Sequence, residues 1–418
     1  MSIVSTIKQA TKLGAAFGIA ILLAGCGGSG SSSNSSTASN TSTTNSATSS
    51  SLASNAVAVS VDAGINGRHP NVPYVSVTVC TPGTTTCQTI DHVILDTGSF
   101  GLRLLASAVT VPLTANTINS KTLGECVGFA DGYVWGALRS ADITIGSKAI
   151  SNAAVQMIGD TSTPSVPTAC AGTGGIARNT VSTLGANGIL GVGQKTADCG
   201  ATCAAAAVPG TYYACSGTSS GSCDPVAVPT ARQIQNPVSL LSTDNNGTVL
   251  IMPTVASSGA VTATGQLLFG IGTQTNNALG SATVIKTDSA GQFTANFNNA
   301  VQQGSYVDSG SNGIFVEDSA FTVCSDNTSF FCPSATQTLT TTLSSTVDTS
   351  NATTSVVIAN ASTLLSAANG TENALPGLAG GGFTTGLDLG MPFFYGKSVF
   401  TALEGASTPG GTGPYVAF

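Results

Sequence analysis

One short pattern occurs twice in this chain, and each copy contains one aspartate. The first copy is Ile94-Leu95-Asp96-Thr97-Gly98-Ser99, and the second is Tyr306-Val307-Asp308-Ser309-Gly310-Ser311. A duplicated fold with a pseudo-twofold axis would bring the two carboxyls face to face. Two carboxyls that lie so close cannot both ionise at low cost, so they share a proton, and such a pair can activate water. The repeat therefore predicts a duplicated fold with an acid–base pair at its centre.

The beginning of the chain is typical of a targeting segment followed by a tether. Residues 1–25 combine two lysines with a short apolar run that is too brief for a confident transmembrane helix. They end in Leu23-Ala24-Gly25-Cys26, which resembles a bacterial lipobox and implies cleavage before Cys26 and lipidation of its thiol. An ordinary cleaved signal peptide that contains a cysteine is the alternative. Residues 26–55 are rich in Ser, Thr and Asn and have too little apolar surface to fold.

These features predict a protein of the bacterial cell envelope that a lipid anchor attaches to a membrane. Gly27 follows Cys26, so the usual acidic signal for inner-membrane retention is absent and the outer membrane is favoured. We expect a monomer. Nucleic acid is excluded as a partner, because only 12 Lys and Arg are spread along a chain of net charge −7.

The remaining residues have the pattern of a mostly β protein. Charged residues make up only 7% of the chain, and 50 glycines supply turns. Period-two or continuous apolar runs predict strands at 57–61, 74–79, 93–95, 141–146, 249–252, 266–270 and 293–297. We place an N-terminal β-lobe with Asp96 at residues 56–235 and a C-terminal β-lobe with Asp308 at 236–418.

Ten cysteines remain after Cys26, an even number that suits disulfides in an oxidising compartment. Local bridges are expected between Cys80 and Cys87 and between Cys324 and Cys332. Four cysteines (Cys199, Cys203, Cys215 and Cys223) are expected to staple one Gly/Ala/Ser-rich stretch, which leaves Cys126 and Cys170 for each other. A metal site at Cys199-x3-Cys203 is the rival interpretation. We expect no metal, because the chain has no Cys-x2-Cys and only two histidines.

The two aspartate motifs resemble those of pepsin-like aspartic proteases. Further segments follow in the order of that family: Ile189-Leu190-Gly191 and Leu387-Asp388-Leu389-Gly390 resemble its hydrophobic-hydrophobic-Gly strands, which cross the active-site loops. The resemblance covers nearly the whole body of the chain. It implies an all-β fold of two duplicated lobes with a cleft between them, and a catalytic pair formed by Asp96 and Asp308.

The resemblance also assigns roles to the residues that flank the aspartates. Thr97 and Ser309 would form hydrogen bonds across the pseudo-twofold axis, and Ser99 and Ser311 would bind the outer carboxylate oxygens. Gly98 and Gly310 would permit a close approach of the backbone. No metal or cofactor is required.

A segment that resembles the family's flap hairpin includes Phe129, Asp131, Gly132 and Tyr133. The family usually has a tyrosine where Phe129 stands, and its hydroxyl helps to order substrate and water. Tyr133 and Trp135 are candidates to replace that hydroxyl. Asp388 is a second departure, since the family normally has an apolar residue there.

Three hypotheses follow for the function. The first is an envelope-anchored endopeptidase that uses Asp96 and Asp308 to activate water against a peptide or protein substrate. The second is a catalytically weak or inactive binding or structural lipoprotein on the same fold, which the departures at Phe129 and Asp388 favour. The third is an unrelated β-rich lipoprotein whose Asp-x-Gly-Ser motifs are turns at strand ends.

Overall fold

The computed structural model describes residues 52–65, 67–172, 174–218, 220–366 and 370–418. Leu52–Phe418 belong to one compact unit. The expected signal peptide at 1–25, the lipidation site at Cys26 and most of the tether lie outside the described residues. Asn55, which we placed at the end of the tether, is buried and donates to the carbonyl oxygen of Phe269 at 3.0 Å.

Strands dominate the unit, as the residue pattern predicts. The N-terminal half contains β1 (Ala56–Val61), β2 (Pro73–Cys80), β3 (Cys87–Asp96), β4 (Phe100–Leu105), β5 (Thr114–Ala115), β6 (Thr117–Ile118), β7 (Lys121–Phe129), β8 (Gly132–Ile145), β9 (Lys148–Ile158), β10 (Ile176–Ala177), β11 (Gly188–Val192), β12 (Tyr212–Ser216) and β13 (Ser222–Pro225). The C-terminal half contains β14 (Gly247–Ile251), β15 (Ala263–Phe269), β16 (Val284–Lys286), β17 (Phe293–Phe297), β18 (Ala300–Val307), β19 (Ile314–Val316), β20 (Gln337–Ser344), β21 (Asn351–Ile358), β22 (Ala379–Gly380), β23 (Leu387–Leu389), β24 (Ser398–Ala402), β25 (Ser407–Thr408), β26 (Gly411–Thr412) and β27 (Tyr415–Ala417).

Four short α-helices interrupt the strands of the described residues: α1 (Thr168–Ala171), α2 (Val181–Leu184), α3 (Ala201–Ala205) and α4 (Ala361–Leu365). Within the described ranges, no helix has both the length and the apolar character that a membrane crossing needs.

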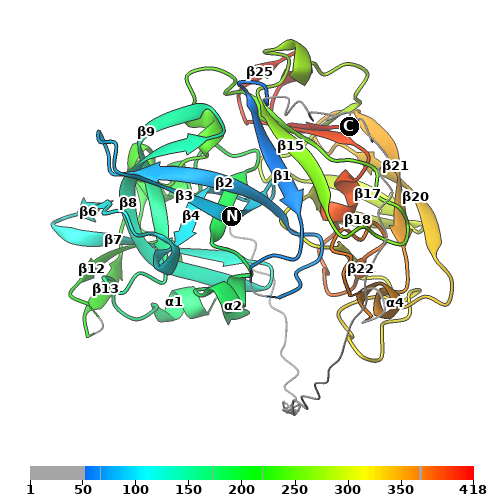
Figure 1. Cartoon of the computed structure of the whole chain (residues 1–418), viewed down its shortest axis with the longest axis horizontal. Coiled ribbons are helices and arrows are strands. Elements are labelled where there is room, and N and C mark those ends of the chain that lie inside the picture. The colour runs from blue at the N-terminus through cyan, green and yellow to red at the C-terminus, as the bar shows by residue number, and fades with distance from the viewer. Residues whose placement is uncertain (1–51, 66, 173, 219, 367–369) are drawn as a thin grey trace, which may run out of the picture. The chain divides into compact units, whose positions relative to one another are not determined.

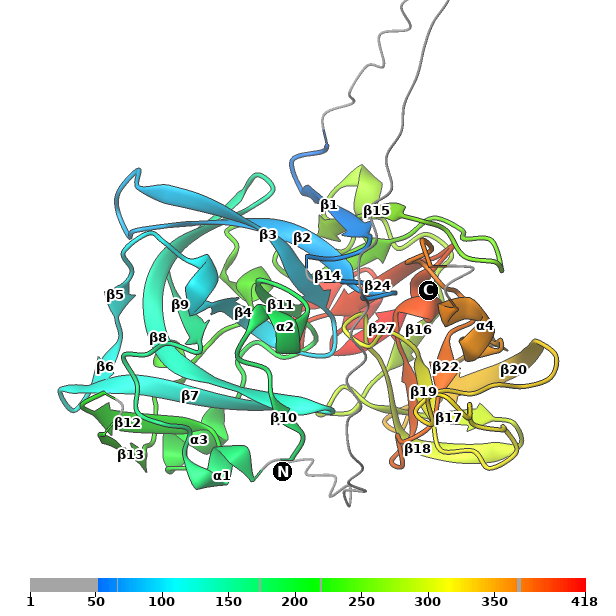
Figure 2. The same cartoon turned by 60° about the horizontal axis from the view of Figure 1, so that its bottom comes forward.

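Among the described residues, the strands form an 18-stranded sheet, a seven-stranded sheet and a small two-stranded sheet. Strands β2 to β13 gather on one side of the unit, and β17 to β23 of the seven-stranded sheet gather on the other (Figures 1 and 2). The large sheet also contains β14, β15, β16, β24 and β27 from the C-terminal half, and therefore joins the two halves.

The connection between the halves begins with the first strand. All six residues of β1 pair with β15, from Ala56 opposite Leu268 to Val61 opposite Ala263. By contrast, β1 pairs with β2 at only two positions. Although β1 precedes Asp96 in the chain, most of its backbone pairing is therefore with the C-terminal half.

In each half, a strand later in the sequence lies between the two strands that flank the aspartate loop and pairs with both of them. In the N-terminal half, β11 pairs in parallel with β3 and antiparallel with β4. In the C-terminal half, β23 pairs in parallel with β18 and antiparallel with β19. The same three-strand arrangement therefore fixes both aspartate loops.

Five disulfides bridge the described cysteines. Cys80–Cys87, Cys126–Cys170 and Cys324–Cys332 pair as expected. The four cysteines of the Gly/Ala/Ser-rich stretch form Cys199–Cys203 and Cys215–Cys223. Because the sulfurs of Cys199 and Cys203 are bonded to each other, the rival metal site at these two residues is not formed.

Candidate functional site

Asp96 is the last residue of β3, and Asp308 follows the last residue of β18. The structure brings the two loops into contact through their glycines. A Cβ added at Gly98 would lie 2.6 Å from Cγ of Asp308, and a Cβ added at Gly310 would lie 2.8 Å from Cγ of Asp96. Each carboxyl therefore lies against the glycine of the other loop, in a space that a larger side chain would fill.

Each loop binds its own carboxylate in nearly the same way. The backbone N–H of Gly98 donates to Oδ1 of Asp96 at 2.7 Å, and that of Gly310 donates to Oδ1 of Asp308 at 2.8 Å. The hydroxyl of Ser99 donates to Oδ2 of Asp96. The hydroxyl of Ser311 donates to Oδ2 of Asp308 at 2.9 Å. These donors fix the orientation of both carboxyls relative to the backbone.

Hydrogen bonds also cross between the two loops. Thr97 N–H donates to Oγ of Ser309 at 3.1 Å, and Ser309 N–H donates to Oγ1 of Thr97 at 2.9 Å. The Ser309 hydroxyl continues to the carbonyl oxygen of Leu95 at 2.7 Å. Both Thr97 and Ser309 are buried, so these bonds act without competition from water and hold the loops together.

The crossing strands require glycine where they pass the loops. A Cβ at Gly191 would lie 2.4 Å from the backbone nitrogen of Phe100, and one at Gly390 would lie 2.1 Å from the carbonyl oxygen of Gly313. Any other residue would push the loop away. This contact explains the glycine of each hydrophobic-hydrophobic-Gly segment in steric terms.

The electrostatics favour a shared proton. Asp96 is buried and Asp308 is half-buried. Burial raises the pKa of Asp308 well above its ordinary value, and the charges of Asp96 and then Asp388 raise it further. A hydrogen bond with Asp96 also raises the pKa of Asp308, while the bond from Ser311 lowers it. One carboxyl of the pair therefore keeps a proton at a pH where an isolated aspartate would lose it.

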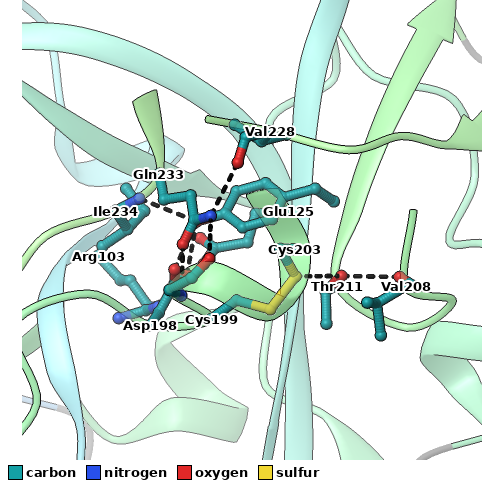
Figure 3. Close-up of a disulfide and its surroundings, with 12 residues drawn as sticks. Arg103, Glu125, Asp198, Cys199, Cys203, Val208, Thr211, Val228, Gln233 and Ile234 are labelled. Atoms are coloured by element: carbon teal, nitrogen blue, oxygen red, sulfur yellow. Dashed lines mark hydrogen bonds and ion pairs between the residues drawn. A yellow bond between two sulfur atoms is a disulfide. The ribbon is translucent and has the colours of Figure 1, made fainter. Parts of the chain in front are cut away.

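A buried ion pair supports β4, the strand that follows the Asp96 loop (Figure 3). Arg103 is 1% exposed; one of its nitrogens donates to Glu125 at 3.0 Å and another to the carbonyl oxygen of Phe100 at 2.6 Å. Asp198, next to the Cys199–Cys203 disulfide, lies 3.6 Å from the same guanidinium. The ion pair thus joins the strand after the Asp96 loop to the disulfide-stapled stretch.

The segment expected as a flap is the end of the β7–β8 hairpin, in which Phe129 pairs with Gly132. The exposed Asp131 at the turn forms an ion pair with Arg178, and Gly132 and Tyr133 pair in parallel with β10. No hydrogen bond or ion pair among the described residues joins Phe129, Asp131, Gly132 or Tyr133 to either aspartate.

The two candidates to replace the missing hydroxyl of Phe129 pack within or against one core cluster. Tyr133 packs beside the Cys126–Cys170 disulfide and Trp135. Trp135 is buried and donates its indole N–H to the carbonyl oxygen of Pro164 at 3.1 Å. Phe129 itself packs against a cluster that contains Leu105.

The structure adds Asn71, a residue that the motifs do not reveal. Its side-chain amide donates to the carbonyl oxygens of Asn312 and Leu375 at 2.9 and 2.8 Å, and it accepts from the hydroxyl of Tyr395 at 2.8 Å. Asn71 is fully buried and has a φ of 60°. It therefore ties a loop of the N-terminal half to the loop of Asp308. A buried asparagine in a left-handed turn leaves no periodic signal in the sequence.

Two further polar residues lie beside Asp308. Tyr306, on β18, is opposite Asp388 on β23. Burial and the negative charges of Asp388, Asp308 and Asp96 raise the pKa of the Tyr306 phenol, so the hydroxyl stays protonated. The sequence marked Asp388 as a departure from the family but gave no sign of its partner.

The fold of this chain has a counterpart among solved structures. The structure is similar to that of an aspartic proteinase from Irpex lacteus, with a TM-score of 0.50 and 15% sequence identity over 87% of this chain and 96% of that one. At this identity the likeness shows the fold alone, and it confirms the expected all-β, pepsin-like fold. Residues 51–418 match the family described as "Protein of unknown function (DUF3443)", and the chain belongs to that family. None of the curated proteins with which the sequence was compared matches it.

Proposed function

We propose that this protein is an aspartic endopeptidase in which Asp96 and Asp308 activate water. The observation that carries the proposal is the paired arrangement of the two loops, in which each carboxyl has its own N–H and hydroxyl donors and lies against the glycine of the other loop. A pair that shares one proton can remove a proton from water with the ionised carboxylate. The protonated carboxyl then donates to the carbonyl oxygen of the peptide bond.

The raised pKa of Asp308 supports its assignment as the proton donor of the pair. Asp96 would then be the base. Because the two groups titrate together, activity is expected to require one proton on the pair and to fail when both carboxyls are ionised.

Hydrolysis of an unfolded protein between about pH 3 and pH 7 tests this proposal. The full-length protein, solubilised in detergent, is expected to cleave the substrate, and both Asp96→Asn and Asp308→Asn are expected to lose at least about 100-fold in rate. Asp91→Asn is the control, because Asp91 lies on the same strand but its side chain is 66% exposed. Equal cleavage by the Asp96→Asn and Asp91→Asn variants would contradict the proposal.

One observation favours the second candidate, a pepsin-like binding or structural protein without catalysis. The turn of the β7–β8 hairpin is tied to Arg178 and to β10, and Phe129 supplies no hydroxyl. A protein of this kind would bind extended peptides without cleaving them. Retained peptide binding by the wild-type protein, with no product at any pH, would favour this candidate.

We also propose that Cys26 anchors a monomer to the bacterial envelope, in the outer membrane. The support is the segment Leu23-Ala24-Gly25-Cys26 and the polar stretch that follows it. Metabolic labelling with a radioactive fatty acid, followed by membrane fractionation, tests the anchor. Loss of label in Cys26→Ala is expected, and label that persists in this variant would contradict it.

A further inference from the structure

The two halves differ at one position beside their aspartates. In the N-terminal half, the parallel pairing of β3 and β11 places Ile94 opposite Ile189, two residues before Asp96. In the C-terminal half, the matching pairing of β18 and β23 places Tyr306 opposite Asp388, two residues before Asp308. A phenol and a carboxyl therefore replace two isoleucines on one side of the pseudo-symmetric site.

The strand geometry directs these polar groups toward Asp308. Side chains two residues apart on a strand point to the same face, so Tyr306 lies on the face of Asp308 and Asp388 lies beside it. Asp388 is only 3% exposed, and its Oδ1 has no hydrogen-bond partner among the described residues. A buried carboxyl with an unpartnered oxygen is costly to retain, and this cost points to a role at the site.

Ser311 connects Asp388 to Asp308. Its hydroxyl donates to Oδ2 of Asp308 at 2.9 Å, and it also interacts with the carboxyl of Asp388. Because a serine hydroxyl has one hydrogen, Ser311 can donate to Asp308 and accept from Asp388 only when Asp388 carries a proton. In that state Asp388 donates to Ser311, and Ser311 donates to Asp308.

The charges around Asp388 favour its protonated form. Asp96, Asp308 and Tyr306 are the titratable groups that act on it or lie against it, while Phe315 of β19 and Phe383 contribute apolar rings. No ion pair with lysine or arginine reaches these carboxyls within the described residues. The pKa of Asp388 is raised to about 8, and burial is the main cause. The charge of Asp96 also raises this pKa, while hydrogen bonds with Ser311 and Tyr306 lower it.

We propose that Asp388 is a positioning residue that orients Ser311 toward Asp308 and extends to higher pH the range in which the aspartate pair keeps its shared proton. The inference rests on the proposed function, because it concerns the same acid–base pair. At low pH, protonated Asp388 donates to Ser311. When Asp388 releases its proton to water at higher pH, its negative charge opposes loss of the last proton from the pair.

The test is the pH dependence of kcat/KM in three variants. Asp388→Asn keeps the shape and a donor but removes the charge, Asp388→Ile recreates the N-terminal counterpart Ile189, and Tyr306→Phe removes the phenol hydroxyl. In Asp388→Asn, the alkaline limb is expected to move to lower pH by about one unit, the lower end of the effect of a neighbouring charge. Asp388→Ile is expected to show the same shift together with a lower acid plateau, because it also loses the donor to Ser311.

Tyr306→Phe checks the direction of the effect. The Tyr306 hydroxyl stabilises ionised Asp388, so its removal is expected to raise the pH at which Asp388 ionises. The plateau of kcat/KM at acid pH is expected to remain, because protonated Asp388 still donates to Ser311. Asp91→Asn should give the wild-type profile. An Asp388→Asn profile that superimposes on that of the wild-type protein would overturn the proposal.

A second measurement separates this inference from the proposed function. If the wild-type protein hydrolyses nothing, the carboxyl carbons can be followed by NMR during a pH titration of 13C-labelled protein. The last proton of the Asp96–Asp308 pair is expected to leave at lower pH in Asp388→Asn than in the wild-type protein. Identical titrations would overturn the role of Asp388, whereas a shift without hydrolysis would sustain it and reject only the endopeptidase.

Discussion

Thr97 and Ser309 bind each other reciprocally: each backbone N–H donates to the hydroxyl oxygen of the other residue, at 3.1 and 2.9 Å. The two residues are 212 positions apart in the sequence. Both hydroxyls also donate to the carbonyl oxygen of a residue on the opposite strand, Ser309 to Leu95 at 2.7 Å and Thr97 to Val307 at 3.5 Å. The two halves are therefore joined by a small, closed hydrogen-bond network directly behind the aspartates.

This network predicts different outcomes for two substitutions at Thr97. Thr97→Val preserves the shape but leaves the Ser309 N–H buried without an acceptor, which should lower the free energy of unfolding by about 1–3 kcal/mol. Thr97→Ser retains the hydroxyl and should cost less. Urea denaturation measures both, and an equal loss in the two variants would show that the hydroxyl does not stabilise the junction.

A second prediction concerns the space between the loops. In Gly98→Ala, the new Cβ would meet the Asp308 carboxyl at 2.6 Å, so that carboxyl must move. A displacement of this kind should reduce peptide hydrolysis by about 100-fold or more. Gly381→Ala is the control, because its Cβ would meet only Phe331, at an ordinary 3.6 Å. Initial rates at acid pH provide the measurement, and a fully active Gly98→Ala would contradict the geometry of the site.

The third prediction concerns the ion pair of Arg103 and Glu125. Arg103→Met leaves the Glu125 carboxyl buried without its cation, and breaking a buried pair in this way typically costs about 3–5 kcal/mol. The double variant Arg103→Met/Glu125→Met removes the buried Glu125 carboxyl as well and should be more stable than Arg103→Met alone. Thermal or urea unfolding measures which of the two variants is more stable. A double variant that is less stable than the single one would mean that the retained Glu125 carboxyl is not the source of the cost.

The fourth prediction is a dependence of stability on pH through Asp388. Its ordinary pKa of 3.8 describes the unfolded chain, and its folded pKa is about 8. Between these values the folded protein binds a proton that the unfolded chain does not, so this residue makes stability fall as pH rises, by at most about 1.4 kcal/mol per pH unit. Below 3.8 both states are protonated, and this dependence ends.

Urea denaturation of the wild-type protein and Asp388→Asn across this pH range isolates the effect. The Asn variant cannot titrate at this position, so it should gain stability relative to the wild-type protein as pH rises from 4 to 8. Parallel curves for the two proteins would show that the Asp388 carboxyl titrates alike in the folded and unfolded states.

Much of the fold is predictable because its signals are local. Period-two alternation marks Val57–Val61 and Tyr74–Val79, and the observed strands extend them by one or two residues. Strand β17 has the expected bounds, 293–297. The close cysteine pairs were predictable for the same reason, since a short separation limits the choice of partner.

Other features depend on which distant segments meet. Nothing local in Ala56–Val61 indicates that it pairs with Ala263–Phe269 rather than mainly with the strand that follows it. Trp135 was a candidate for the site, but its indole N–H is bound to Pro164 and its ring packs in the core. Such outcomes arise from packing against segments remote in the sequence.

The sequence by itself determined the two aspartate motifs, the glycines beside them and the strand periodicity, because sterics and side-chain alternation act over a few residues. Only the tertiary structure decided that Tyr306 lies opposite Asp388 and that Ser311 contacts the carboxyls of both Asp308 and Asp388. That neighbourhood depends on the register of β18 against β23. Strand register is set by the burial of whole faces and by long-range pairing, neither of which is encoded in any single short segment.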